Sequence, residues 1–215
     1  MARVPTGSTN WIATTIAAAK TTTIVTNAAE AVVTSAAHGY SNGDVVIVGS
    51  GWGRLHNRAF RIKSITTDTF VLEGADTANT TLFSPGTGIG NVRKVTAFTQ
   101  ITTVMAPSSS GGEPKTVSYK FQEDENEYTL NDGFSPVQRS INLDADSIGT
   151  AGYTALKTFT DSGADTVWRT NAKSGAVSYL VATVSLNEEE IITDGQIVQV
   201  KCAISGRSRS TRYAS

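Results

Sequence analysis

Short runs of β-branched residues constrain this chain more than any other feature of its sequence. Val, Ile and Thr dominate the periodic segments, and their stiff side-chain torsions favour strands over helices. Between residues 24 and 96 these runs alternate with turn signals such as Asn42-Gly43 and Thr66-Thr67-Asp68. We therefore predict a compact, barrel-like β-module with strands at Ala31 to Ser35, Asp44 to Val48, Ala59 to Ile65 and Thr69 to Glu73.

The C-terminal third has the clearest alternation of apolar and other residues. Two strands are predicted there, and Thr193-Asp194-Gly195 supplies a turn between them, so the strands are expected to pair as a hairpin. The first strand has a second face that is only half polar. The apolar face of the first strand comprises Leu180, Ala182, Val184 and Leu186, and that of the second comprises Val198, Val200, Cys202 and Ile204.

One segment has helical periodicity. Tyr153, Leu156 and Phe159 recur at helical spacing, with Thr150 as a candidate N-cap and Gly163 as a candidate C-terminal stop. A helix is predicted over about 150–161. One short helix on a sheet gives a mainly β fold with an α+β flavour.

The domain organisation follows from the segments without periodicity. Residues 79–91, which contain Pro85, predict an irregular connection, and we place a domain boundary near Val92. The predicted domains are a small inserted β-module over 24–91 and a larger β-domain formed by 1–23 and 92–215. The low-complexity stretch from Ala106 to Pro114 is predicted to be an exposed flexible loop. It precedes a strand in which Val117, Tyr119 and Phe121 alternate with polar residues.

Charge and cysteine content exclude several classes of function. Lys plus Arg number 18 against 19 for Asp plus Glu, so the net charge of -1 creates no global field for nucleic acid or anionic membrane. Cys202 is the single cysteine, which excludes an intramolecular disulfide framework and fits an intracellular folding compartment. No signal peptide is predicted, and no apolar run is long enough to span a membrane, so no membrane partner is expected.

The sequence offers no catalytic, cofactor or metal site. His38 and His56 each lie in a Gly-rich turn with no further ligand at metal-binding spacing, which favours ordinary turn residues. The run Gly49 to Gly53 lacks the Gly-Lys-Ser/Thr of a phosphate-binding loop. Gly39 to Gly43 has the pattern G-x-S-x-G around Ser41, but a nucleophilic serine also needs a base and an orienting group, and no serine lies beside a persuasive His/Asp pair.

Two charge clusters of opposite sign are candidate binding elements. The acidic run 123–127 is either a solvated loop or an intersubunit contact, and the same alternatives hold for Glu188-Glu189-Glu190 at a predicted hairpin tip. The basic tail 205–212 is either a disordered end or an arm for an acidic partner. Such a chain can bind copies of itself head to tail. The predicted interface residues are Glu123, Asp124, Glu125, Glu127, Arg207, Arg209 and Arg212.

Several stretches, in order along the chain, resemble the bacteriophage tail tube proteins of long non-contractile tails. Val95 to Ile101 with Ser109 to Glu113 is similar to that family's first strand and glycine-rich loop, and Tyr119-Lys120-Phe121 is similar to its aromatic strand with an acidic continuation. Asp144-Ala145-Asp146 is similar to the family's strand end, Gly152 to Leu156 to its single helix, and Ser208 to Tyr213 to its C-terminal end. The front segments Ala37 to Tyr40, Gly43 to Val46 and Thr69 to Gly74 resemble a small β-module of phage structural proteins that would decorate the outside.

The resemblance implies a β-sandwich flanked by one helix, with six copies closing into a ring whose inner sheets form a continuous barrel. Stacked rings would form a hollow tail tube that conducts DNA, in the virion and, during assembly, in the host cytoplasm. The implied partners are the subunit itself, the tape measure, the tail terminator and distal tail proteins, with transient passage of double-stranded DNA. No enzymatic activity is implied.

A lumen through which DNA slides is expected to be neutral or acidic, because every Lys or Arg contact to phosphate adds affinity and friction. Polar positions of the two C-terminal strands are the lumen candidates, although a lysine is unfavourable there. These positions are Thr183, Ser185, Gln199 and Lys201.

Three other interpretations remain open on the sequence. A head-to-tail connector or a tail terminator would form one ring and would not polymerise. A surface-binding or carbohydrate-binding protein would expose Trp52 and Tyr40 of the front module as a stacking pair, whereas a structural Trp52 would be buried. A hydrolase would depend on His38 or His56.

Overall fold

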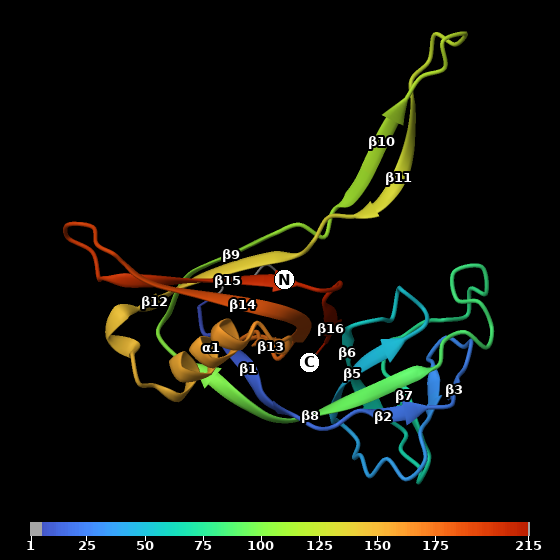
Figure 1. Cartoon of the computed structure of the whole chain (residues 1–215), viewed down its shortest axis with the longest axis horizontal. Coiled ribbons are helices and arrows are strands. Elements are labelled where there is room, and N and C mark those ends of the chain that lie inside the picture. The colour runs from blue at the N-terminus through green and yellow to red at the C-terminus, as the bar shows by residue number, and fades with distance from the viewer. Residues whose placement is uncertain (1–5, 215) are drawn as a thin grey trace.

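The chain is mainly β-structure in the computed structural model, which describes residues 6–214. One 14-stranded sheet contains most of the strands, and a separate two-stranded hairpin projects from it (Figure 1). The helices among these residues are α1 (Ala151–Ser162) and the 3₁₀ turn η1 (Ala145–Ser147). The predicted fold class, mainly β with one α-helix, is confirmed.

The strands follow one another with short connections, in keeping with the turn signals of the sequence. Their bounds are β1 (Thr9–Ile16), β2 (Lys20–Thr22), β3 (Ile24–Val25), β4 (Val32–Thr34), β5 (Val45–Ser50), β6 (Arg58–Lys63), β7 (Thr69–Leu72), β8 (Gly90–Ile101), β9 (Val104–Ser110), β10 (Pro114–Tyr119), β11 (Tyr128–Phe134), β12 (Gln138–Asp144), β13 (Thr166–Asn171), β14 (Val177–Ile191), β15 (Gln199–Gly206) and β16 (Thr211–Tyr213). All pairings are antiparallel, and the sheet runs β3-β4-β7-β6-β5-β8-β1-β13-β14-β15-β12-β9.

The sheet from β8 to β9 curls around α1. The predicted apolar faces of β14 and β15 meet there in one core, which also includes Leu156 of α1 and Trp168 of β13. Thr150 caps α1 by accepting a hydrogen bond from the backbone N–H of Tyr153, and Gly163 ends the helix in the left-handed conformation. The predicted helix and the predicted β14–β15 hairpin are both confirmed.

A second core lies in the module built from β3 to β7. Phe60, Phe70 and Leu72 are fully buried in it, and all four predicted strands of this segment are present. The N-terminal part of β8 pairs with β5 and its C-terminal part pairs with β1, so one strand joins the module to the rest of the sheet. The division at residue 92 therefore falls within a strand and stays a prediction. Residues 1–5 of the predicted segment 1–23 lie outside the described residues.

A third apolar cluster packs the module against the back of the curled sheet. It includes Ile47 of β5, Tyr179 and Val181 of β14, and Tyr213 of β16. The half-polar second face of β14 is thus buried over its first half. Because both faces of this part of the strand are covered, residues Tyr179 to Ala182 are all buried.

Three local predictions are wrong. The predicted loop from Ala106 to Pro114 contains strand β9 and the start of β10, because backbone pairing with β12 compensates for its small polar side chains. The run Glu188 to Glu190 continues strand β14, whereas it was predicted at a hairpin tip. The basic tail 205–212 is not a disordered end, because its residues 211 and 212 belong to β16, which pairs with β14, whereas its role as an arm for an acidic partner stays a prediction.

The exposed stacking pair predicted for a carbohydrate-binding module is also wrong. Trp52 is 4% exposed and its ring packs against Phe83, with 5.3 Å between the ring centroids. Tyr40 is 8% exposed and contacts His38 and Phe70. Both aromatic residues belong to the core of the module, as the structural interpretation of Trp52 predicted. Across residues 6–214, none of the helices combines the length and the apolar character that crossing a membrane requires.

Candidate functional site

The hairpin formed by β10 and β11 exposes apolar side chains on one face. Val117 lies opposite Leu130, and Tyr119 lies opposite Tyr128, so these four side chains share a face. Phe121 continues the face and contacts Tyr119, with 5.3 Å between the ring centroids. Val117 is 50% exposed and Leu130 is 60% exposed. The predicted alternation of this segment is present, but no part of residues 6–214 covers its apolar face.

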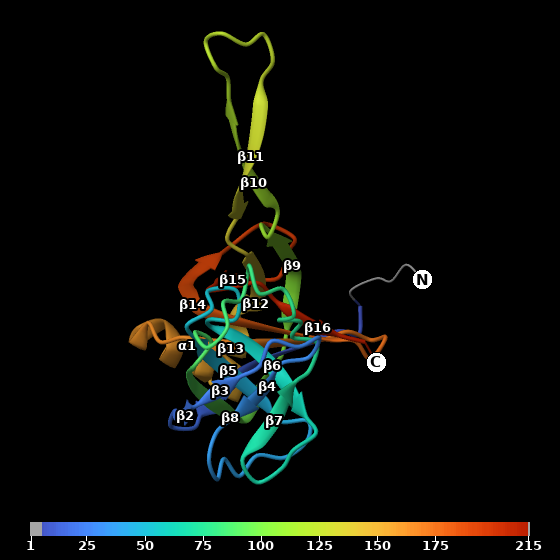
Figure 2. The same cartoon turned by 90° about the vertical axis from the view of Figure 1, so that its right-hand side faces the viewer.

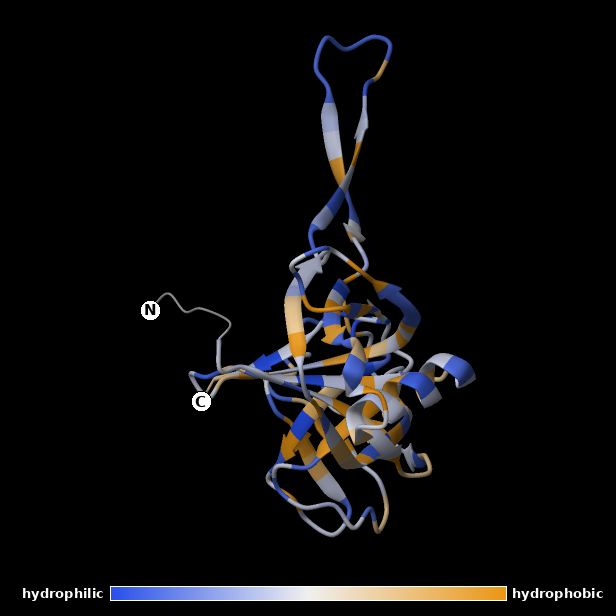
Figure 3. Cartoon of the chain, turned by 90° about the vertical axis from the view of Figure 1, so that its left-hand side faces the viewer, coloured by the Kyte–Doolittle hydropathy of each residue, from blue (hydrophilic) through white to orange (hydrophobic). Residues whose placement is uncertain are grey.

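The acidic run lies at the tip of this hairpin, in the connection between Tyr119 and Tyr128 (Figures 2 and 3). The Asp124 carboxylate accepts hydrogen bonds from the Tyr128 hydroxyl and the Asn126 backbone N–H, which lower the pKa of Asp124. Within the described chain, no cation lies within 4.0 Å of the carboxylates in this run. We call residues 120–127 the acidic tip, because four carboxylates stand there against the single cation of Lys120.

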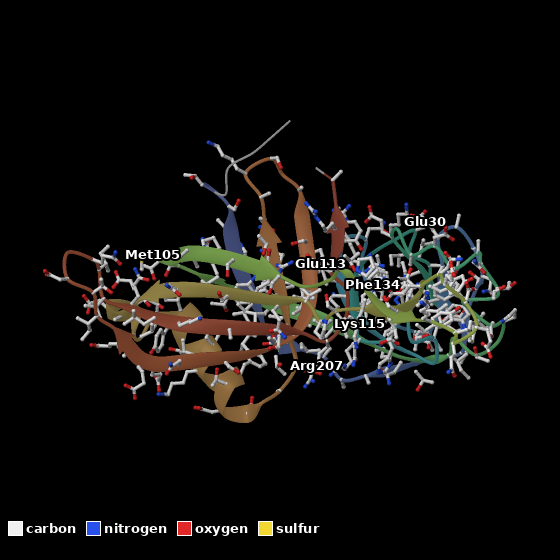
Figure 4. All side chains as sticks on the ribbon, turned by 90° about the horizontal axis from the view of Figure 1, so that it is seen from above. Glu30, Met105, Glu113, Lys115, Phe134 and Arg207 are labelled. Atoms are coloured by element: carbon white, nitrogen blue, oxygen red, sulfur yellow. The ribbon has the colours of Figure 1, made fainter. Side chains whose placement is uncertain are left out.

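A cavity of about 690 Å³ opens at the base of the hairpin, between β9, β12 and the turn from β13 to β14. We call it the arginine groove, because its charged lining residues are Arg139, Arg209, Arg212 and Glu113. Figure 4 places Glu113 and Phe134 at the foot of the hairpin. The Arg209 guanidinium lies 4.3 Å from the centroid of the Phe134 ring. The groove therefore carries an excess of positive charge.

Arg139 is the innermost of the three cations. It is half-buried on β12, and its Nη1 donates a hydrogen bond of 3.2 Å to the Thr170 hydroxyl. Burial lowers the pKa of Arg139, and the nearby Arg212 lowers it further. Within residues 6–214, no carboxylate oxygen lies within 4.0 Å of any of the three guanidinium groups.

The structure separates the predicted interface residues into different places. Arg209 and Arg212 lie together in the arginine groove, whereas Arg207 is paired with Asp165 at 2.7 Å. The predicted acidic residues lie on the tip, away from all three (Figure 1). The sequence analysis missed Arg139. A signal existed, because Arg139 shares one face of β12 with the buried Ile141 and Leu143 and so places a charge on the apolar face of a strand.

The predicted lumen residues lie on the outward face of the curled sheet, opposite the core. Lys201 lies between Asn142 and Asn187 of the neighbouring strands, and Gln199 lies beside Asp144. Polar side chains on this face bond one another across strands, as between Ser205 and Gln138 at 3.0 Å. By alternation, the outward positions of three strands carry one cation, Lys201, and two anions, Asp144 and Glu189. These outward positions are Gln138, Ser140, Asn142 and Asp144 of β12, Thr183, Ser185, Asn187, Glu189 and Ile191 of β14, and Gln199, Lys201, Ala203 and Ser205 of β15.

The two histidines occupy structural positions. His38 is 3% exposed, and its Nδ1 accepts a hydrogen bond of 3.0 Å from the backbone N–H of Tyr40. Nδ1 of His56 lies 3.1 Å from the Ser50 carbonyl. Burial raises the pKa of the Cys202 thiol to about 12, which suppresses its thiolate at neutral pH. In the described part of the chain, no three His, Cys, Asp or Glu side chains converge as metal ligands would.

The chain is similar in sequence to a known protein family. The sequence matches the family model described as phage tail tube protein, TTP, over residues 50–215. The match begins within the module and includes the hairpin, α1 and the C-terminal strands. No curated protein matches the sequence. Since the match covers more than half of the chain, the protein belongs to the phage tail tube protein family and is a structural protein of the phage tail, where it assembles with itself and with other tail proteins.

Proposed function

We propose that the chain is a tube subunit that assembles into stacked rings of six copies and encloses the conduit through which DNA leaves the virion. The observation that supports this most directly is the exposed apolar face of the hairpin. A two-stranded hairpin is at best marginally stable in water, and clustered exposed apolar side chains mark interaction surfaces. Val117, Tyr119, Phe121, Tyr128 and Leu130 would be covered by neighbouring copies.

The free edges of the sheet support closure into a ring. Strand β9 is at one end of the sheet, and most of its residues are exposed. Unpaired strand edges invite pairing with another chain, and a closed barrel of subunits removes them. Six copies per ring follows from the family resemblance.

The outward face of β12, β14 and β15 is our candidate for the lumen wall. It presents mainly hydroxyl and amide groups, and its one cation, Lys201, stands against two anions, Asp144 and Glu189, so the face is slightly acidic. DNA phosphates would find few cations along such a wall, so non-specific binding would be weak. Thr183, Ser185, Gln199 and Lys201 would line the lumen together with the polar positions of β12.

The lumen assignment is tested by adding charge to the wall. Ser185→Arg should slow DNA ejection from phage particles whose tails look normal, because a ring of added cations would hold the phosphate backbone. Thr67→Arg, at an exposed turn of the module, is the matched control. Equal ejection rates for both variants would place Ser185 outside the lumen.

The proposed partners of the subunit and the proposed role of its module follow from its place in a tube. The tape measure, the tail terminator and distal tail proteins would bind its inside and its two ends, after assembly in the host cytoplasm. The module over 24–91 would decorate the outer surface, and the subunit would have no catalytic activity.

Negative-stain electron microscopy, fresh and after prolonged concentration, tests the assembly, with chromatography to follow its state. Hollow tubes of stacked rings are expected. Isolated rings that never stack would instead favour a connector or terminator, and a lasting monomer would favour a binding module. Ring symmetry in averaged end views tests the number of copies.

A further inference from the structure

We propose that the arginine groove of one subunit receives the acidic tip of the hairpin from another copy of the chain, an inference that rests on the proposed assembly. Each subunit presents two charged features of opposite sign, the arginine groove and the acidic tip. Among residues 6–214, three guanidinium groups line the groove with no carboxylate oxygen within 4.0 Å, and four carboxylates lie on the tip with no cation within 4.0 Å.

The groove has the properties of a site for carboxylates. Arg139 comes from β12, Arg209 from the segment before β16 and Arg212 from β16 itself, so the guanidinium groups approach the cavity from different elements. Arg139 is partly desolvated and uses one N–H on the Thr170 hydroxyl, which leaves other donors for a ligand. A half-buried cation without a counter-charge is unfavourable, and bidentate binding of a carboxylate by arginine relieves that cost.

The tip cannot reach the groove of its own subunit. The groove lies at the foot of the hairpin, while β10 alone has six residues and extends for about 20 Å at the usual rise of a strand. The ladder between β10 and β11 keeps the two strands extended (Figures 1 and 2). A carboxylate from a second copy is therefore the partner that this charge distribution fits.

Other groups restrict how the tip can enter. Glu113 also lines the groove and would repel an acidic segment, so the tip should approach the three arginines from the side away from Glu113. Arg209 is held against the Phe134 ring, which restricts the position of its guanidinium. Arg207 takes no part, because Asp165 already neutralises it.

Peptide binding tests the groove separately from tube assembly. The probe is a labelled peptide with the sequence of residues 119–128, titrated by fluorescence anisotropy into dilute, unassembled full-length protein. Saturable binding is expected that weakens as salt rises, and Arg139→Gln or Arg212→Glu should weaken it by roughly tenfold or more. The control variant is Arg54→Glu, because Arg54 is exposed on the module and lies outside the groove.

The peptide itself has a matched control in which Glu123, Glu125 and Glu127 are replaced by Gln and Asp124 by Asn. Equal binding of both peptides would overturn the inference. So would equal binding by the Arg212→Glu and Arg54→Glu proteins.

Charge exchange tests the contact in the tube. Reversal of the tip (Glu123→Lys, Glu125→Lys and Glu127→Lys) or of the groove (Arg209→Glu and Arg212→Glu) should each reduce the tube yield, and the combination should restore it. If both single reversals assembled like the wild type, or the combination restored nothing, the docking would be wrong. Tubes from the wild-type chain would still support the proposed function in that case, whereas a wild-type chain that never forms rings or tubes would contradict the function itself.

Discussion

The module and the hairpin have similar alternating sequences but opposite burial. In the module, Phe60 and Phe70 are fully buried among the side chains of five strands and their connections. In the hairpin, Phe121 is 58% exposed and Leu130 is 60% exposed. Both segments are antiparallel β-structure, so the difference lies in what covers the apolar face. The module covers its own face, whereas the hairpin leaves its face for a partner.

This contrast separates stability from assembly within one chain. Burial of apolar area stabilises the isolated subunit at the module and in the curled sheet. The hairpin contributes little to that stability, because its side chains lose little water in the monomer. Substitutions in the two regions should therefore affect different measurements.

The largest effect on stability is expected for Phe60→Ala in the module. Phe60 is 0% exposed, and removal of its ring leaves a cavity in a packed core, so the free energy of unfolding should fall by about 3–5 kcal/mol. Urea denaturation of the dilute protein measures it. Phe121→Ala in the hairpin is the matched control and should change the same quantity by about 0.5 kcal/mol or less. Equal decreases in the free energy of unfolding for Phe60→Ala and Phe121→Ala would show that the module and the hairpin do not differ in their contribution to stability.

A smaller effect is expected where the C-terminal strand holds the module against the curled sheet. The hydroxyl of Tyr213 accepts a hydrogen bond of 2.8 Å from the backbone N–H of Arg61 and donates one to the Glu73 carbonyl. Burial raises the pKa of Tyr213 to about 12, and the nearby Glu73 also raises it. In the unfolded chain the phenol ionises near pH 10.

Stability should therefore fall as the pH rises from about 10 to about 12, because the unfolded state loses the proton of Tyr213 before the folded state does. The contribution of this tyrosine is about 2–3 kcal/mol for a shift of this size, and it is fully present below pH 10. Urea denaturation of the wild type and of Tyr213→Phe across this range measures it. The variant should show a shallower decline, and parallel declines would show that Tyr213 does not control alkaline stability.

The alternation of apolar residues predicted the strands of both regions, since the period of side-chain burial is a local property. It also predicted which faces of β14 and β15 form the core. Helical spacing and capping residues, which are local as well, predicted the helix with its caps at Thr150 and Gly163. It did not predict β9, because Ser108, Ser109 and Ser110 have no apolar face and are held by pairing with β12. Pairing between distant segments is not encoded in local composition.

The same limit applies to the candidate site. The acidic run and the basic tail were visible as charge clusters, but the sequence placed Arg207 with Arg209 and Arg212 and missed Arg139. The pairing of Arg207 with Asp165 and the position of Arg139 beside Arg212 depend on tertiary contacts. A charge on the apolar face of a strand, as at Arg139, was the one local indication of the groove.

The smallest effect on monomer stability, and the most informative one for assembly, is expected for Val117→Ser combined with Leu130→Ser. These residues lie opposite each other and are half or more exposed, so their replacement should change the free energy of unfolding by about 0.5 kcal/mol or less. Tube yield in electron microscopy should nevertheless fall sharply, because neighbouring copies would lose the apolar surface that they bury. Thr116→Ala combined with Thr129→Ala, on the polar face of the same hairpin, is the control and should assemble normally. If the serine pair assembled as well as this control, the exposed apolar face would have no role in the tube, and the contrast between the module and the hairpin would reflect local folding alone.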